Sequence, residues 1–258
     1  MDSRTRRTRA ITPPAAALCV LSLLALCVTV RPLLGAQAGQ PPTGVQTLHV
    51  RENIWMLVTP DGNLALQVGP EGALLVDTGR NGTSDAVLAA IRHITTRPLR
   101  YIINTSAGPS RIGNNVAFGL LAGGATDRRG SGPIPAIIAH ESVLARMSAP
   151  SAQNAAAYPV AGWPSDAYAA RERSIRYNGE AIDIIHQPSA YSDGDSIVYF
   201  RRSDVIVSGE IFSTKRFPLV DREHGGTVKG VLAGLNRMLD IAVPEVVVEN
   251  FAEGGTLV

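Results

Sequence analysis

Cysteine is nearly absent from this chain of 258 residues. The only two, Cys19 and Cys27, lie close together in an apolar run near the N-terminus. If that run is removed during export, no thiol remains in the mature protein. The absence then excludes disulfide bridges, a cysteine nucleophile and thiolate zinc sites.

Histidine is scarce and scattered. No two histidines are separated by two or four positions, which are the spacings of local metal-binding motifs. A metal site would therefore have to be assembled from distant segments. The five are His49, His93, His140, His186 and His224.

Charge and aromatic content are both low. The chain has 24 Lys and Arg against 22 Asp and Glu, and aromatic residues make up 5% of it. Four of the arginines lie in "RTRRTR", residues 4–9, so the rest of the chain is close to neutral. Because no basic stripe interleaved with aromatics is present, we expect no nucleic-acid partner.

The N-terminus is typical of a targeting segment. A basic stretch precedes the apolar run of residues 15–30, and Ala36 and Ala38 form the small-x-small pattern that precedes signal cleavage. We expect a signal peptide over residues 1–38, a linker over 39–47, and export to the periplasm or the extracellular space. The alternative is an N-terminal membrane anchor that is retained, although spanning a bilayer takes roughly 20 residues.

The remaining chain predicts a β-sheet protein with helices on its outer faces. Four short β-rich runs between residues 45 and 79 favour an antiparallel meander. Strand and helix patterns then alternate, and a helix over residues 227–240 has a clear apolar stripe. Residues 148–172, rich in Ala, Pro and Ser, are expected to form a surface excursion or a loose helix. Two sheets packed face to face, with helices outside, satisfy this order.

Two longer stretches resemble the metallo-β-lactamase fold superfamily. The first is "ALLVDTG", a helix, then "LRYIINT" with a turn ending in "GNN"; the second is "HQPSAYSDGDSIVYFRRSDVIVSGEIF". The likeness covers residues 48–258. It implies an α/β (α+β) fold, a four-layer αββα sandwich that holds metal ions between the sheet edges.

The resemblance also implies where metal ligands would lie. The family uses a His-x-His-x-Asp-His turn, a later His, a bridging Asp and a final His, which together hold zinc and make a hydroxide nucleophile. In this chain only Glu210 keeps a ligand-type side chain, at the position of the bridging Asp. The final His would lie beyond Val258. The other positions fall on Ser106, Gly108, Ser110, Arg111 and Tyr191.

A single carboxylate does not meet the ligand requirement of catalytic zinc, which takes at least three protein ligands. Arg111 also places a permanent positive charge where the metal charge would lie. We expect Arg111 to pair with Glu210. By the resemblance, Asp77 braces the turn through hydrogen bonds to Thr105 or Ser106, while capping of a strand end is the alternative.

Other candidate sites have less support from the sequence. A cluster of His186, His224 and Glu210 is conceivable but has no supporting motif. Ser106 or Ser110 as a nucleophile would need a base and an oxyanion hole, and neither a G-x-S-x-G nor an S-x-x-K motif occurs. The Gly-rich stretch of residues 123–132 lacks the Gly-Lys-Ser/Thr of a phosphate loop. Each of these interpretations is weaker than a structural role.

The sequence leaves two hypotheses open. The first is an exported protein that has lost zinc-dependent hydrolysis, needs no cofactor, and binds an unidentified small molecule or protein. The second is a zinc-dependent hydrolase of esters, thioesters or lactams with a non-standard site. The sequence stops at "EGGTLV", short of the family's last ligand-bearing loop. We expect the resulting sheet edge to be prone to self-association.

Overall fold

The computed structural model describes residues 44–124, 134–150, 158–242 and 256–257. The chain divides into two compact units, Met1–Gly39 and Gln40–Val258, and every described residue lies in the second. The expected signal peptide (residues 1–38) and the expected strand "PEVVVEN" (residues 244–250) lie outside the described residues. Within the described part, no helix is long and apolar enough to cross a membrane.

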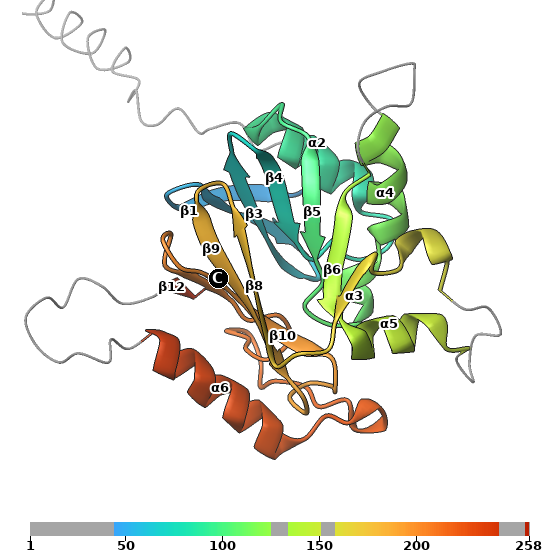
Figure 1. Ribbon diagram of the computed structural model, residues 1–258, viewed down its shortest axis with the longest axis vertical. Coiled ribbons are helices and arrows are strands. Elements are labelled where there is room, and N and C mark those ends of the chain that lie inside the picture. The colour runs from blue at the N-terminus through green and yellow to red at the C-terminus, as the bar shows by residue number, and fades with distance from the viewer. Residues whose placement is uncertain (1–43, 125–133, 151–157, 243–255, 258) are drawn as a thin grey trace, which may run out of the picture. The chain divides into compact units, whose positions relative to one another are not determined.

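The first β-sheet has seven strands in the order β1-β2-β3-β4-β5-β6-β7 (Figure 1). Neighbours from β1 to β4 pair antiparallel, which confirms the predicted meander, and neighbours from β4 to β7 pair parallel. The strands are β1 (Gln46–Arg51), β2 (Ile54–Thr59), β3 (Gly62–Gly69), β4 (Gly72–Val76), β5 (Leu99–Ile103), β6 (Ala136–His140) and β7 (Asp166–Tyr168).

The second sheet has five strands in the order β12-β11-β10-β9-β8. All pairs are antiparallel except β11 with β12. Its strands are β8 (Glu172–Tyr177), β9 (Glu180–Gln187), β10 (Asp195–Phe200), β11 (Val205–Val207) and β12 (Thr256–Leu257). Strand β12 lies at the edge of this sheet. Self-association through that edge stays a prediction.

Helices pack on the outer faces of both sheets. Leu57 and Leu75 of the first sheet lie in one apolar cluster with Ile91 of α2 and Phe118 of α4, and Ile206 of the second sheet lies in another with α6. This gives four layers and confirms the αββα architecture (Figure 1). The helices are α2 (Ser84–Ile94), α3 (Pro109–Ile112), α4 (Asn115–Gly124), α5 (Glu141–Ser148) and α6 (Val228–Ala242), with short 3-10 turns η1 (Val160–Gly162) and η2 (Arg222–His224).

Strand β4 shows why the chain can bury two faces of one sheet. Successive side chains on a strand point to opposite faces. Ala73 and Leu75 accordingly pack toward α2, whereas Leu74 and Val76 pack against Phe200 between the two sheets. Each fully buried side chain of the size of Leu or Phe contributes about 1.5–3 kcal/mol. An uninterrupted apolar strand is therefore the signature of this central position.

The sequence prediction is wrong in part for residues 148–172. Strand β7 lies in this stretch and adds to the first sheet beside β6, and β8 begins at Glu172. The sequence of β8, "ERSIRY", alternates exposed and half-buried side chains, so it lacks the apolar character of a core strand. Its conformation depends instead on pairing with β9. An ion pair also joins Arg173 to Asp166, with an N–O distance of 2.7 Å.

A buried carboxylate joins the two sheets. Glu180 on β9 is 2% exposed and accepts hydrogen bonds from the Gln67 side chain on β3 at 2.6 Å and from the Ser203 hydroxyl at 2.9 Å. The backbone N–H groups of Arg202 and Ser203 donate to its other oxygen at 3.1 and 3.0 Å. The carboxylate therefore accepts four hydrogen bonds, and among the donors the Gln67 side chain and the Ser203 backbone N–H are buried.

We predict that Glu180→Ala lowers the free energy of unfolding by at least about 3 kcal/mol, because each orphaned buried donor costs about 1–3 kcal/mol. Denaturant titration followed by circular dichroism measures the change. Glu71→Ala is the matched control: its side chain is exposed in the β3–β4 turn, and the expected change is within about 0.5 kcal/mol. Equal effects of the two substitutions would contradict a connecting role for Glu180.

Candidate functional site

The candidate site lies where β4 and β5 end side by side. These strands are parallel, so the residues that follow them, Asp77 and Asn104–Ser106, come together at one edge of the sheet. The Asp77 backbone N–H donates to the carbonyl of Ile103 at 2.8 Å. Asp77 has a φ of +64°, an uncommon conformation for a residue with a side chain. The chain turns sharply there and directs the carboxylate into the interior.

Asp77 braces the turn as the resemblance implied. Its Oδ1 accepts from the backbone N–H of Thr105 at 2.8 Å, and its Oδ2 accepts from the Thr105 hydroxyl at 2.8 Å. Ser106, the alternative partner, instead accepts a hydrogen bond from the Gly108 backbone N–H at 3.2 Å. Burial raises the pKa of Asp77 to about 6, while Arg111 and the Thr105 hydrogen bonds oppose that rise.

Asparagine side chains hold the backbone of the turn in place. Asn115 donates to the Asn104 side chain at 2.8 Å and accepts from the Thr78 hydroxyl at 2.9 Å. The Arg111 carbonyl accepts from the Thr78 backbone N–H at 2.8 Å and from the Asn104 side chain at 3.3 Å. The Asn-Thr and Gly-Asn-Asn segments that frame the turn therefore fix the position from which the Arg111 side chain starts.

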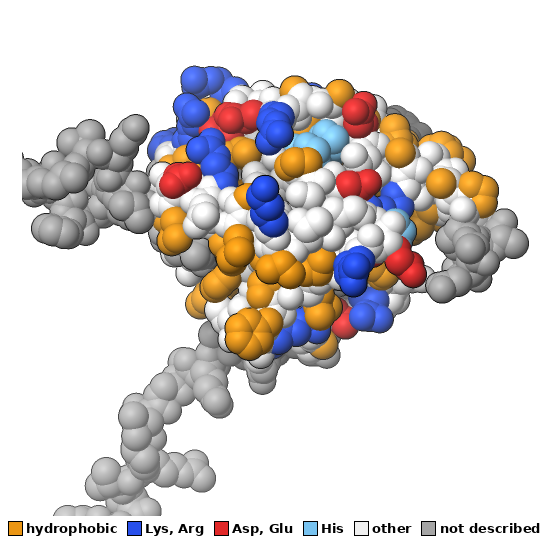
Figure 2. Space-filling model, turned by 90° about the horizontal axis from the view of Figure 1, so that it is seen from below, with side chains coloured by type: hydrophobic (Ala, Val, Ile, Leu, Met, Phe, Trp, Pro, Cys, Tyr) orange, Lys and Arg blue, Asp and Glu red, His pale blue; other side chains and the backbone are white. Residues whose placement is uncertain are grey.

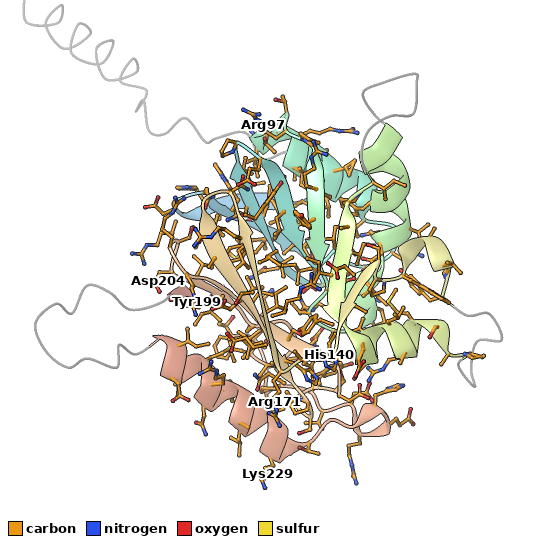
Figure 3. All side chains as sticks on the ribbon, viewed as in Figure 1. Arg97, His140, Arg171, Tyr199, Asp204 and Lys229 are labelled. Atoms are coloured by element: carbon orange, nitrogen blue, oxygen red, sulfur yellow. The ribbon has the colours of Figure 1, made fainter. Side chains whose placement is uncertain are left out.

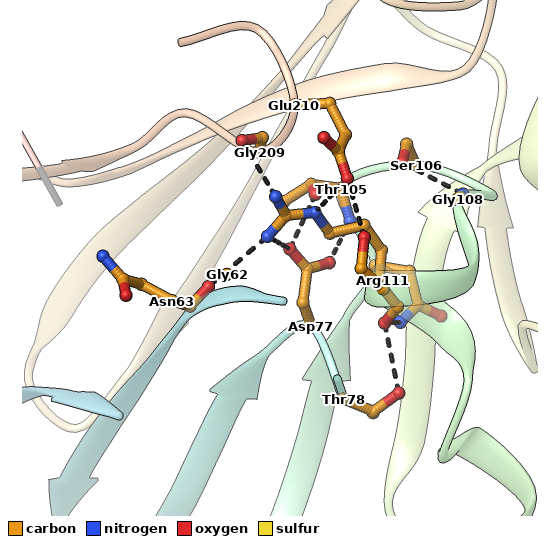
Figure 4. Close-up of polar contacts among 12 residues, drawn as sticks. Gly62, Asn63, Asp77, Thr78, Thr105, Ser106, Gly108, Arg111, Gly209 and Glu210 are labelled. Atoms are coloured by element: carbon orange, nitrogen blue, oxygen red, sulfur yellow. Dashed lines mark hydrogen bonds and ion pairs between the residues drawn. The ribbon is translucent and has the colours of Figure 1, made fainter. Parts of the chain in front are cut away.

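The guanidinium of Arg111 occupies the centre of the site (Figure 4). Only 7% of the residue is exposed. The expected ion pair is present, since Nε donates to Glu210 Oε1 at 3.0 Å. A second pair was not expected from the sequence: Nη1 contacts Asp77 Oδ2 at 3.3 Å. The backbone carbonyls of Asn63 and Gly209 accept from the remaining N–H groups at 3.4 and 3.3 Å.

The guanidinium of Arg111 favours the charged form of each carboxylate, while Glu210 opposes charge on Asp77. Burial disfavours charge on Arg111, but Asp77 and Glu210 together raise its pKa above the ordinary value. Burial alone would raise the pKa of Glu210, yet Arg111 and a hydrogen bond from the Ser110 hydroxyl at 2.8 Å hold it below its usual range. Glu210 and Arg111 are thus held in their charged forms beside Asp77, whose pKa lies at about 6.

A glycine lets the second half of the chain approach the turn. Gly209 has a φ of +58°, and a Cβ there would lie 2.7 Å from Thr105 Oγ1 and 2.9 Å from Thr105 Cβ. A side chain would meet both a strained backbone and a steric clash. Glycine at this position therefore brings the neighbouring Glu210 within reach of Arg111.

Several of the predicted ligand positions do converge. A Cβ built on Gly108 would lie 3.2 Å from Ser106 Oγ and 3.7 Å from both Arg111 Cγ and Glu210 Oε1. Side chains at these four positions therefore face a common point. Tyr191 comes from the loop after β9; its side chain is half-buried, and burial raises the pKa of its hydroxyl.

These residues do not fit a zinc ion. Serine hydroxyls and a glycine offer no imidazole or thiolate, and Glu210 is already bound to Arg111. Among the described residues there is no group of three or more His, Cys, Asp and Glu side chains arranged to hold a metal. A divalent ion beside Glu210 would in addition lie against a buried guanidinium and be repelled by it.

The histidines are placed apart from this centre. His186 stacks on His140, with ring centroids 3.4 Å apart, and its Nε2 lies 2.7 Å from the Asp193 carbonyl oxygen. His140 lies at the end of β6, close to α5 (Figure 3). Burial lowers the pKa of both rings. His224 pairs with Asp221 at 2.6 Å, so the conceivable His186, His224 and Glu210 cluster does not form.

We predict that Arg111→Ala lowers the free energy of unfolding by about 3–5 kcal/mol, because it leaves two buried carboxylates without a counter-charge. Equilibrium unfolding in urea measures the loss. Arg80→Ala is the control, since its 3.0 Å pair with Asp61 involves a side chain that is 58% exposed and is expected to contribute about 0–1 kcal/mol.

A combined variant with Arg111→Met, Asp77→Asn and Glu210→Gln removes all three charges together. Because no unpaired charge remains, it should recover a large part of the stability lost in Arg111→Ala. If Arg111→Ala costs no more than Arg80→Ala, the guanidinium does not hold the centre together.

The raised pKa of Asp195 predicts how the stability of the protein depends on pH. Burial raises its pKa to about 7, although hydrogen bonds from Ser192 and the charge of Arg146 oppose the rise. Its Oδ1 is buried with no hydrogen-bond partner in the described structure. A folded-state pKa above the unfolded value of 3.8 means that folding takes up a proton, so this group's contribution to stability falls as pH rises from about 4 to about 7.

Asp195→Asn should therefore weaken the fall of stability with pH in this window, by at most about 1.4 kcal/mol per pH unit. Urea unfolding at four pH values spaced from weakly acidic to weakly alkaline gives the slope for both proteins. The variant is expected to be at least as stable as the wild type above the folded-state pKa. Parallel pH profiles would show that Asp195 does not titrate there.

Comparison with known proteins supports the fold. No protein-family model matches the chain, and no curated protein matches it. Among solved structures, a metallo-β-lactamase from Pontibacter korlensis matches with a TM-score of 0.56 at 14% identity, over 76% of this chain and 85% of that one. A Cronobacter sakazakii metallo-β-lactamase described by a HARLDQ motif matches with a TM-score of 0.57 at 19% identity, over 75% and 76%.

A metallo-β-lactamase family protein from Thermus thermophilus is similar to a comparable degree. The TM-score is 0.54 at 18% identity, over 77% of this chain and 70% of that one. Identities this low carry information on architecture only. Taken with the two packed sheets and the helices outside them, these likenesses show that the chain has the metallo-β-lactamase fold.

Proposed function

We propose that this is an exported protein of the metallo-β-lactamase fold that has no zinc-dependent hydrolytic activity and acts as a binding or accessory protein. The observation that carries the proposal is the Arg111 guanidinium, buried between Asp77 and Glu210 at 3.3 and 3.0 Å. It supplies the positive charge that a bridging metal would otherwise give to Glu210. The N-terminal basic and apolar segment supports export.

Chemistry at the remaining positions supports the same proposal. Zinc-dependent hydrolysis needs a metal with an open coordination position for water. Ser106, Gly108 and Ser110 converge on Glu210, but the two serines provide only hydroxyls and the glycine provides no side chain. One similar structure is described by a HARLDQ motif, which has Arg and Gln where His-x-His-x-Asp-His has histidines. Departure from the histidine pattern therefore occurs elsewhere in this fold.

The second candidate is a hydrolase of esters, thioesters or lactams with a non-standard site. One contact favours it, because the Ser110 hydroxyl donates to Glu210 at 2.8 Å, as a nucleophile donates to a base. Against it, the pKa of Glu210 is held below its usual range. A weakly basic carboxylate that is also paired with Arg111 accepts a proton poorly.

Metal content separates the proposal from a zinc-dependent hydrolase. We predict that the purified protein, dialysed without chelator, contains no stoichiometric zinc and that added zinc leaves its Tm unchanged. A specific site filled at about 100 times its Kd would instead add about 2.7 kcal/mol to the stability. Inductively coupled plasma mass spectrometry and thermal unfolding give the two measurements. One equivalent of tightly held zinc would contradict the proposal.

The positive control is a variant with Ser106→His, Gly108→His, Ser110→Asp and Arg111→His. A side chain at position 108 has room to point toward Glu210, with Ser106 Oγ at 3.2 Å as its nearest neighbour. This variant should gain zinc, because three imidazoles and a carboxylate then face one point. If it folds and still binds none, the assignment of these positions is wrong.

A further inference from the structure

Helix α6 exposes an apolar stripe, here called its outer side, next to the residues that pack on the second sheet; Leu235 of the same stripe packs partly against that sheet. Its inner side packs on the sheet through Val231, Gly234 and Met238, which are all buried. Val228 and Leu232 on the outer side are 68% and 56% exposed. Leu239, two turns further, is 57% exposed and lies on the same side, because residues separated by four and seven positions share one side of a helix.

The loop before α6 exposes larger apolar side chains. Phe217 is 93% exposed, Leu219 is 51% exposed and Phe212 is 37% exposed. A fully exposed phenylalanine is unusual on a soluble surface, and several together mark a contact site. Lys215 and Arg216 precede Phe217 directly and are exposed as well. We name Phe212–Leu219 and the outer side of α6 the α6 face.

Positive charge is in excess on the α6 face. Residues 212–242 contain five cations, Lys215, Arg216, Arg222, Lys229 and Arg237, against the three carboxylates Asp221, Glu223 and Asp240. Asp221 is paired with His224, and Arg237 lies 3.9 Å from Glu172 of β8. Lys229 projects outward from the first turn of α6 (Figure 3). Among the described residues, Lys215, Arg216 and Lys229 form no ion pair, although Arg216 acts on Glu210, whose pKa it helps to lower.

The space-filling view from below shows this arrangement. Hydrophobic side chains gather on part of the face, and Lys and Arg side chains border them, with few Asp or Glu among them (Figure 2). Apolar groups bordered by cations are the pattern of surfaces that rest on an anionic bilayer, where aromatic and aliphatic side chains enter the headgroup boundary and Lys and Arg meet the headgroups.

We propose that the α6 face binds an anionic membrane surface, with Phe217 and Leu219 entering the headgroup region and Lys215, Arg216 and Lys229 contacting lipid phosphates. A second copy of the chain fits less well. A two-fold interface places the same patch on both subunits, so these cations would face their own copies. An acidic bilayer satisfies the charge and the apolar groups together.

The test uses the full chain with a local probe, because the N-terminal apolar run could itself hold the protein on vesicles. Phe217→Trp reports the depth of this one position through quenching by brominated lipids. Val160→Trp is the matched control, since Val160 is 71% exposed on η1, apart from α6 in Figure 1. The signal of Trp55 and Trp163 is subtracted using the wild-type protein.

We expect brominated phosphatidylglycerol vesicles to quench the tryptophan at 217 and not the one at 160. Brominated phosphatidylcholine should quench it weakly, and added salt should reduce the effect. Lys215→Glu with Arg216→Glu should weaken vesicle affinity about tenfold or more, since each cation near an anionic surface contributes about fivefold.

Three results would overturn the proposal. One is a tryptophan at 217 that stays unquenched although the protein sediments with the vesicles. Another is equal quenching at 160 and 217. The third is a dimer in analytical ultracentrifugation that shields position 217 from iodide without lipid, which would identify a second copy as the occupant.

Discussion

The site depends on a single guanidinium held between two carboxylates. Arg111 joins the end of β4, through Asp77, to the loop after β11, through Glu210, and so connects the two sheets. The attraction is strong because the three groups are buried and screened little by water. Removal of the guanidinium alone would leave two buried carboxylates without a counter-charge, whereas removal of either carboxylate leaves one ion pair.

The surrounding residues make this arrangement possible. The left-handed backbone at Asp77 directs its carboxylate inward, the asparagine network fixes the start of the Arg111 side chain, and Gly209 allows the second sheet to come close. Conformational strain and close backbone approach of this kind concentrate at functional sites. Together these features place the guanidinium of Arg111 between Asp77 and Glu210.

Much of this could be predicted from the sequence. The apolar strand at residues 73–76 reflects burial, which sequence patterns report well, and the Arg111–Glu210 pair follows from the resemblance. The apolar stripe of α6 predicted the helix, but only part of that stripe is buried, since Val228, Leu232 and Leu239 are exposed. The second partner of Arg111 could not be found, because Asp77 is a turn residue by sequence and its φ of +64° is set by tertiary contacts. Strand β8 was not predicted because most of its side chains are exposed or half-buried. Its strand conformation comes from backbone pairing with β9 rather than from an apolar pattern.

The central positive charge belongs to the Arg111 side chain, so it is part of the polypeptide itself. A metal-containing relative would have to acquire its ion from the surroundings before its carboxylates were neutralised, and its stability would follow the supply of that ion. Here the neutralising group is synthesised with the polypeptide. The carboxylate pair therefore reaches its final electrostatic state as soon as the chain folds, in environments rich or poor in transition metals alike.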